Sequence, residues 1–189
     1  LPLRFVAPAG RIAARDYETR ILATGDVPTR ADTWHDALNA LVWLRFPRFK
    51  SALNAAHGLA IDAETEALRG RRRDALTVLD ESGVWVASED PALPALLVAH
   101  AWTEAFWTRR AEIESRMRFI VVGHALLEKA LAPYPAMTGK CLQIGTAMHD
   151  AEAAACSALD TIGSPRQLAP LPIQGIPSWD PANGQADYY

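Results

Sequence analysis

Apolar residues recur at helical spacing through the first third of the chain. The stripe in 14–24 is followed by Gly25, a residue type that commonly ends helices. Pro47 suits the first turn of a new helix, which Gly58 is expected to close. The expected buried face of segment 33–45 carries Trp34, Leu38, Leu41 and Val42. The predicted helices are therefore 14–24, 33–45, 47–57 and a short one within 62–70.

The apolar period changes after residue 74. Segments 75–80 and 83–88 are rich in Leu, Val, Thr and Trp, and ESG between them offers a turn in which Gly83 can take a positive φ. We therefore predict a β-hairpin, and because both of its faces are largely apolar we expect it to be covered on both sides. MRFIVVG, 117–123, is a third predicted strand, and KCLQIG, 140–145, is a fourth.

The rest of the chain is predicted to be helical, apart from its tail. The predicted helices are a long one over 95–115, a short one over 124–131 and a last one over 148–162. The Pro-rich tail, 164–189, is too apolar to float free, so we expect it to lie in extended form on the domain surface. The whole pattern predicts a single α+β domain, 1–189, with about six helices packed on a small, mostly antiparallel sheet of three or four strands.

Composition narrows the compartment and the partners. The 189 residues are 50% hydrophobic and 22% charged, which is typical of a soluble globular protein. The net charge of -3 gives no overall attraction to nucleic acid or to an anionic membrane, and the apolar stretches are too short to span a bilayer. No export signal is visible. Cys141 and Cys156 are expected to be reduced thiols, which favours a cytoplasmic protein, and the oligomeric state stays open.

The start of segment 33–45 carries the first candidate site. His35 and Asn39 share one helical face, and Asp36 lies three residues before Asn39, so together they suit an acid–base or ligand-binding group. The alternative is structural: Thr33 and Asp36 have the spacing of a capping box, and His35 can be an ordinary packed histidine. Both interpretations remain open at this stage.

A second polar stripe follows at the same spacing. Lys50, Asn54 and His57 lie at i, i+4 and i+7 of the next predicted helix. The stripe suits ligand binding, but a solvated face with His57 near the helix C-terminus explains it equally well.

The junction FIVVGHALLEK carries the third candidate. Gly123 ends a predicted strand, so His124 starts a helix and Glu128 lies one turn further on the same face. A His–Glu pair at this spacing can bind a metal or act as a general base with its orienting carboxylate. Asp80, with Asp74 and Glu81 near it, adds carboxylates that suit a divalent cation or ordinary turn chemistry.

Two functions follow from these residues. The first is a hydrolase in which His35, Asp36, His124 and Glu128 are catalytic, with Asn39, Lys50, Asn54 and Asp80 binding the ligand. In this hypothesis His35, His57 and His124 hold a divalent metal that activates water. The second is a non-catalytic module that binds a ligand, a protein or nucleic acid through the basic stretch around Trp43, Phe46 and Phe49, although the net acidity argues against nucleic acid. Recognisable phosphate-loop, serine-hydrolase and zinc-protease motifs are absent from the sequence.

A family resemblance rests on five segments spread over about residues 17 to 179. They are GDVPTRADTWHDALNALVWLRFPRFK, LNAAH, RRRDALTVLDESGV, GHALLEK and PLPIQGIPSW. In this order they resemble a bacterial family catalogued as domain of unknown function 3025, which implies a proteobacterial cytosolic protein and a single-domain unit but no activity. LTVLDE lacks the aromatic residue expected before the acids, a difference that affects packing. The family's polar motif residues fall here on His35, Asp36, Asn39, Lys50, Asn54, His57, Asp74, Asp80, Glu81, His124 and Glu128.

Overall fold

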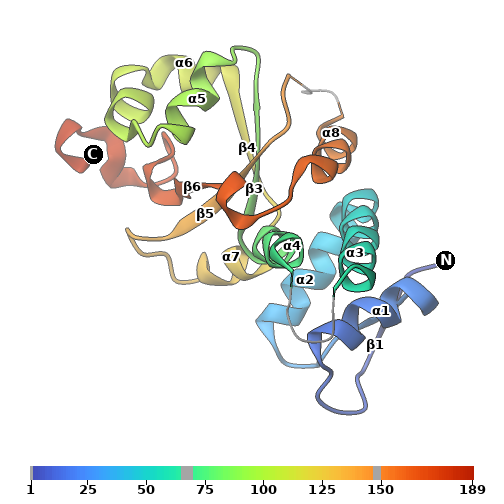
Figure 1. Ribbon diagram of the computed structural model, residues 1–189. Helices are drawn as coiled ribbons and strands as arrows, with labels where there is room; N and C mark the ends of the chain where they lie inside the picture. Colours follow the sequence, from blue (N-terminus) through green and yellow to red (C-terminus); the bar gives the residue numbers. More distant parts are fainter. Residues whose placement is uncertain (1, 65–69, 147–149) are drawn as a thin grey trace.

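The computed structural model describes residues 2–64, 70–146 and 150–189, and its fold is α+β (Figure 1). The α-helices are α1 (Ala14–Thr24), α2 (Trp34–Arg45), α3 (Pro47–Asp62), α4 (Arg71–Ser82), α5 (Ala92–Val98), α6 (Arg110–Arg116), α7 (His124–Lys129) and α8 (Ala151–Ala158). The strands are β1 (Arg4–Val6), β2 (Asp26–Pro28), β3 (Gly83–Ser88), β4 (Met117–Val121), β5 (Thr138–Gln143) and β6 (Ala169–Pro172).

The main sheet has four strands in the order β4-β3-β5-β6 within the described residues. β3 pairs antiparallel with β4 and parallel with β5, and β6 closes the far edge antiparallel to β5. The sheet is therefore mixed, with antiparallel pairs at both edges and a parallel pair in the middle. β1 and β2 form a separate parallel pair near the N-terminus.

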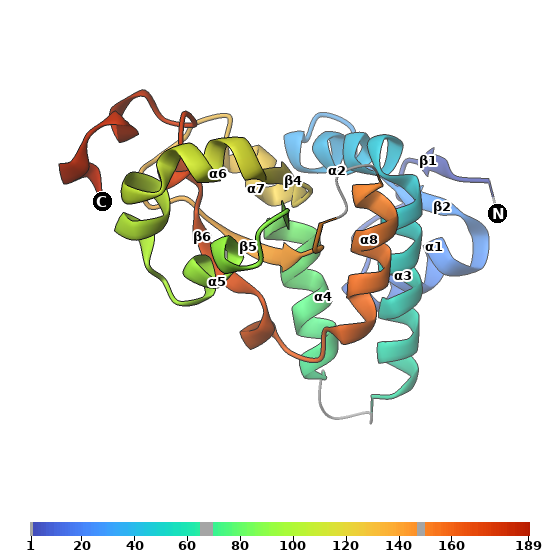
Figure 2. The ribbon, with the colours of Figure 1, turned by 90° about the horizontal axis from the view of Figure 1, so that it is seen from above.

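β3 divides the core into two layers, because its side chains alternate between two covered faces. Trp85 and Ala87 pack into a cluster with side chains of α3, α4 and α8, whereas Val84 and Val86 pack with those of α5, α6 and α7. Figure 2 shows these two groups of helices on opposite sides of the strands. Every residue of β3 is consequently buried, as expected for a strand covered on both sides.

The predicted hairpin over 75–88 is wrong in its first half. Residues of α4 replace the strand, and Leu76 and Leu79 are buried at helical spacing. Gly83 is extended, with φ -68°, so the helix runs straight into β3 without a turn. A Cβ at Gly83 would lie 2.3 Å from the carbonyl oxygen of Leu79, so glycine is needed here for close approach. The antiparallel partner of β3 is β4.

The predicted long helix over 95–115 is also wrong. α5 ends before His100, which takes the left-handed conformation with φ 56°. The N–H of Ala101 donates to the carbonyl of Leu96 at 2.9 Å, a Schellman-type ending that usually employs glycine. A π-helical segment, Glu104–Thr108, then leads into α6. Because histidine stands where glycine is usual, this break has no local signal in the sequence.

The buried face of α2 differs from the predicted one. Trp34 and Leu41 are exposed, and the inward residues are Asn39, Val42 and Trp43. The helix therefore directs a polar amide inward, toward α1 and α3. Because apolar residues also occupy its outer face, periodicity alone does not identify the buried face of α2.

α3 is longer than predicted. It continues through Gly58 to Asp62, and a Cβ at Gly58 would lie 2.7 Å from Cδ2 of Leu22. Gly58 thus allows α1 and α3 to pack closely and does not end the helix. Because the helix continues, His57 lies inside it.

The remaining elements follow the sequence pattern more closely. The helix over 14–24 and the strand in KCLQIG are confirmed, the latter as β5. The short helix expected within 62–70 falls mostly on 65–69, outside the described residues, as does the start of the helix expected over 148–162. In the tail, β6 joins the sheet, and Leu171, Ile173 and Ile176 are buried.

Candidate functional site

A cleft of about 370 Å³ lies where α1, α2, α3, α4 and α7 meet. Its lining includes seven of the polar residues that the sequence singled out: His35, Asp36, Asn39, His57, Asp80, Glu81 and His124. Lys50 is bonded directly to two of the lining residues, and Glu128 is bonded to His35. The chain thus gathers side chains from four separate elements around one hollow.

Two helix–strand junctions bring His124 into the cleft. α4 passes into β3 at Gly83, and β4 passes into α7 through Gly123, whose N–H donates to the Gly83 carbonyl at 2.9 Å. A Cβ at Gly123 would lie 2.5 Å from the Gly83 nitrogen and from Cα of Ser82, so the two backbones touch. This contact sets the first residue of α7 beside the last turn of α4, where Asp80 lies.

His35 and His124 contact each other across α2 and α7. Their Nε2 atoms are 3.0 Å apart, and their ring planes cross at 78°. At this distance one nitrogen donates a hydrogen and the other accepts it, so one proton lies between the two Nε2 atoms. The side chain of His35 is 39% exposed and that of His124 is 7% exposed, so the pair joins the open cleft to the interior.

Each imidazole has a carboxylate near its Nδ1, but only Glu128 is within hydrogen-bond distance, and Nδ1 of His124 makes no hydrogen bond within the described residues. Nδ1 of His35 lies 2.9 Å from Oε2 of Glu128, and Nδ1 of His124 lies 3.8 Å from Oδ2 of Asp80. Glu128 therefore serves the histidine of another helix, which corrects the expectation of a His124–Glu128 pair along one helix. Burial lowers the pKa of His124, and the charge of Asp80 offsets part of that shift. His124 is accordingly held in its neutral form.

The Lys50 stripe is buried, which corrects the solvated-face alternative. Lys50 is 3% exposed, and its Nζ donates to Asp80 Oδ1 and, at 2.9 Å, to Asn39 Oδ1. The amide of Asn39 in turn donates to the hydroxyl of Tyr17 at 2.8 Å. Burial alone would raise the pKa of Asp80, but the charge of Lys50 and its hydrogen bond bring it below its ordinary value. Asp80 is therefore an ionised carboxylate inside the protein.

Glu18 is a site residue that the sequence reasoning missed. Asn54 donates to its Oε2 at 2.6 Å and to its backbone carbonyl at 3.0 Å. Burial, followed by the charge of Asp80, raises the pKa of Glu18 from 4.5 to about 7. Its position beside Tyr17 on α1 carries no sequence signal, because only the packing of α1 on α3 brings it to the cleft.

Asp36 has a partner of its own. Its carboxylate accepts hydrogen bonds from the Arg30 guanidinium at 2.8 and 3.0 Å and from the Arg30 backbone N–H at 2.7 Å. Thr33 caps α2 by accepting from the Asp36 backbone N–H at 3.4 Å, so half of the predicted capping box is present. The Arg30 bonds lower the pKa of Asp36. Asp36 thus fixes the loop before α2 at the cleft rim.

The acidic and basic residues around α4 are largely engaged in structure. The carboxylate of Asp80 is bonded to Lys50, so it does not combine with Asp74 and Glu81 as an open cation site. Arg73 pairs with Glu64 at 3.1 Å. Arg72 donates to the Ile162 carbonyl at 3.1 Å.

The donor set does not fit the metal hypothesis. In 2–64, 70–146 and 150–189, no group of three or more His, Cys, Asp or Glu side chains is arranged to hold a metal ion. His35 and His124 converge, but His57 does not complete a three-ligand set with them, and catalytic zinc sites use three protein ligands. The described residues therefore do not form a three-ligand catalytic zinc site.

Comparisons with known proteins identify a family. The model of the family described as "Protein of unknown function (DUF3025)" matches residues 3–189, essentially the whole chain. No curated protein and no solved structure matches the chain. Within the described residues, no helix is both long and apolar enough to cross a membrane.

Proposed function

The chain belongs to the DUF3025 family, and from the geometry of its cleft we propose that it is a hydrolase that works by general acid–base catalysis. The observation that carries this proposal is the 3.0 Å contact between Nε2 of His35 and Nε2 of His124, with the Glu128 carboxylate hydrogen-bonded to Nδ1 of His35. An imidazole whose Nδ1 is held by a carboxylate is the usual form of a general base.

His35 is the proposed general base, because it is the more exposed of the two histidines. When a substrate water takes the place of His124 at Nε2, His35 accepts a proton from it and the hydroxide attacks the substrate. Glu128, accepting from Nδ1–H at 2.9 Å, stabilises the imidazolium that forms. His124 then returns as the partner of Nε2 after turnover and donates its own Nε2–H to it, and burial keeps His124 neutral.

Glu18 is the proposed general acid. With a pKa of about 7 it carries a proton in much of the protein near neutral pH, while Asp80 in the same cleft is ionised. Two carboxyl groups whose environments separate their pKa values in this way suit opposite roles in catalysis. Glu18 donates its proton to the leaving group, and the imidazolium of His35 returns a proton to Glu18 through solvent, so the cycle balances.

The experiment is a set of chromogenic substrates: p-nitrophenyl acetate, p-nitrophenyl phosphate, bis-p-nitrophenyl phosphate, an amino-acid p-nitroanilide and a p-nitrophenyl glycoside. We expect hydrolysis of at least one class, with kcat/KM lowered about 100-fold or more in His35→Ala. His100→Asn is the matched control, because His100 is exposed outside the cleft and Asn tolerates its left-handed backbone. No hydrolysis of any class, or equal loss in both variants, would reject the proposal.

Chelation separates this mechanism from a metal-dependent one. Because the proposed groups are protein side chains, activity should be unchanged after dialysis against EDTA. A loss that zinc or manganese restores would refute the acid–base mechanism and identify the two Nε2 atoms as metal ligands.

The cytoplasm is the proposed compartment, and nucleic acid is not a proposed partner. Cys141 and Cys156 are free thiols, which suits a reducing compartment. The net charge of -3 provides no general attraction to phosphates. Flow-through on heparin at low salt is the expected result, and salt-dependent retention would favour the binding-module alternative.

A further inference from the structure

We propose that a second hollow, between α7 and the C-terminal tail, binds a planar heteroaromatic compound that carries a lactam or amide edge. The inference does not depend on the proposed hydrolase activity. It rests on the shape of the cavity, on one buried amide and on two aromatic side chains.

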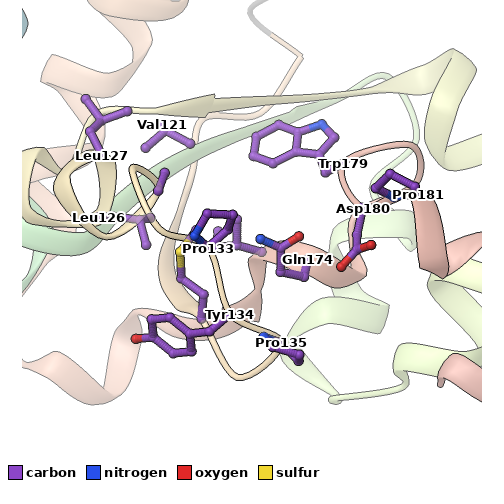
Figure 3. Close-up of a pocket in the computed structure, with 13 residues that line it drawn as sticks. Val121, Leu126, Leu127, Pro133, Tyr134, Pro135, Gln174, Trp179, Asp180 and Pro181 are labelled. Atoms are coloured by element: carbon purple, nitrogen blue, oxygen red, sulfur yellow. The ribbon is translucent and has the colours of Figure 1, made fainter.

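The cavity has a volume of about 480 Å³ and is mainly apolar. One wall is made by α7 and the loop after it, including Leu126 and Met137, and the other by the tail, including Ile173 and Pro181. Figure 3 shows these two walls facing each other. A mainly apolar hollow of this size with few polar groups is typical of a small-molecule site.

Gln174 supplies the polar group. The residue is 8% exposed, and its side-chain amide makes no hydrogen bond to any part of the chain that the structure describes. In Figure 3 this amide lies inside the cavity, between Pro133 and Asp180. The backbone carbonyl of Gln174 accepts from the buried amide of Asn183 at 2.7 Å, so the residue is held in place from behind. The amide is not among the fully enclosed polar groups, so its oxygen and nitrogen face the space of the cavity, where a ligand can pair with them.

Two aromatic side chains define the shape of the ligand. Trp179 and Tyr134 line the cavity and lie on either side of the Gln174 amide in Figure 3, and both remain partly exposed. Aromatic surfaces at a cavity mouth favour a flat ring. Both oxygens of the nearby Asp180 carboxylate already accept hydrogen bonds, from the Ala182 N–H and the Tyr188 hydroxyl.

The chemistry of Gln174 selects the ligand edge. A primary amide presents one acceptor oxygen and N–H donors side by side. Its full complement is a neighbouring donor and acceptor, as in a lactam or a carboxamide. An aromatic ring without this edge fills the same space but leaves the Gln174 amide unpaired.

The test compares two bicyclic probes, 2-quinolone, which has the lactam edge, and quinoline, which lacks it. Affinities are measured by calorimetry and by the shift of the Trp179 indole N–H resonance, assigned with Trp179→Phe. We expect 2-quinolone to bind about tenfold more tightly than quinoline. Equal affinities, or no binding of 2-quinolone up to its solubility limit, would overturn the proposal.

Three variants test whether Gln174 causes the preference for 2-quinolone and whether both probes bind in this cavity. Gln174→Met keeps the size of the side chain and removes its hydrogen bonds, so it should abolish the preference for 2-quinolone while leaving quinoline binding within about threefold. Gln143→Met, on an exposed residue of β5, is the control and should keep the preference. Ala130→Trp, which fills the mouth of the cavity, should block both probes. A preference that survives Gln174→Met, or binding that survives Ala130→Trp, contradicts the assigned site.

Discussion

Replacing Lys50 by methionine gives the sharpest test of the cleft's electrostatics. The side chains of Lys50 and Asp80 are 4% and 15% exposed, and Nζ bonds both Asp80 and Asn39. Methionine has a similar volume and removes only the charge and the hydrogen bonds. The change therefore leaves Asp80 as a buried carboxylate without its cation.

The magnitude follows from the burial of the pair. At hydrogen-bond distance two unit charges attract by about 6 kcal/mol at an effective dielectric constant of 20, and desolvation offsets much of that gain. When one partner of a buried pair is removed, the other keeps its desolvation penalty, which costs about 3–5 kcal/mol. For a chain of 189 residues this corresponds to a fall in Tm of roughly 6–20 °C.

The loss should depend on pH with a defined sign. In the wild type the pKa of Asp80 is lowered, so the pair contributes stability above the unfolded value of about 3.9 and loses it as pH falls through the folded value. In Lys50→Met burial dominates and raises the pKa of Asp80, so the variant can take up a proton at lower pH. The deficit relative to wild type is therefore expected to be larger at pH 8 than at pH 5.

Urea unfolding at both pH values measures these differences. Lys50→Met/Asp80→Asn should be more stable than Lys50→Met, because it removes the unpaired charge as well. Lys129→Met, on an exposed lysine, is the control and should change the free energy of unfolding by less than about 0.5 kcal/mol. A loss below about 1 kcal/mol in Lys50→Met, or a loss that does not vary with pH, would refute the view that Lys50 holds Asp80 ionised.

Three further predictions concern single residues. The pKa of Glu18 is raised to about 7, so its carboxyl contributes stability below the unfolded value of about 4.5 and loses that contribution as pH rises through 7. The stability of Glu18→Gln relative to wild type should therefore rise by up to roughly 3 kcal/mol between pH 4.5 and 8, measured by urea unfolding. A difference that does not change with pH would contradict the shift. Gly123→Ala should lower the free energy of unfolding by about 2–3 kcal/mol, because its Cβ would lie 2.5 Å from backbone atoms. Gly184→Ala is the control and should be near neutral, because open space surrounds that position. Equal melting temperatures for the two variants would disprove the close contact. Gln174→Met should change the free energy of unfolding by less than about 0.5 kcal/mol without ligand, since the amide faces the cavity and makes no bond within the described residues, and a loss above about 1 kcal/mol would show that the amide is bonded.

The sequence predicted elements well where one period dominated. Segment 14–24 and the strand in KCLQIG have clear patterns and form as expected. In α4, however, Leu76 and Leu79 have helical spacing while Thr77 and Val78 favour a strand, and only packing against α3 and α7 decides between them. The end of α5 depends on a left-handed histidine, His100, for which local sequence offers no rule.

The residues of the cleft were easier to find than their partners. Type and helical spacing selected His35, Asn39 and His124, and these do line one hollow. Which carboxylate serves which imidazole depends on the contact of α2 with α7, so Glu128 was assigned to the wrong histidine. Glu18 stayed hidden for the same reason, because its raised pKa arises from burial between helices that are distant in sequence.

The six-residue helix α7 belongs to both hollows. His124 faces the cleft and Leu126 lines the apolar cavity, while Gly123 fixes the start of the helix against Gly83. Because α7 is shared, binding in one hollow affects the affinity of the other hollow whenever it displaces the helix. The coupling is reciprocal. If a compound in the cavity changes the affinity of the cleft for its ligand by some factor, that ligand changes the affinity of the cavity for the compound by the same factor. Allosteric control would then require no separate domain.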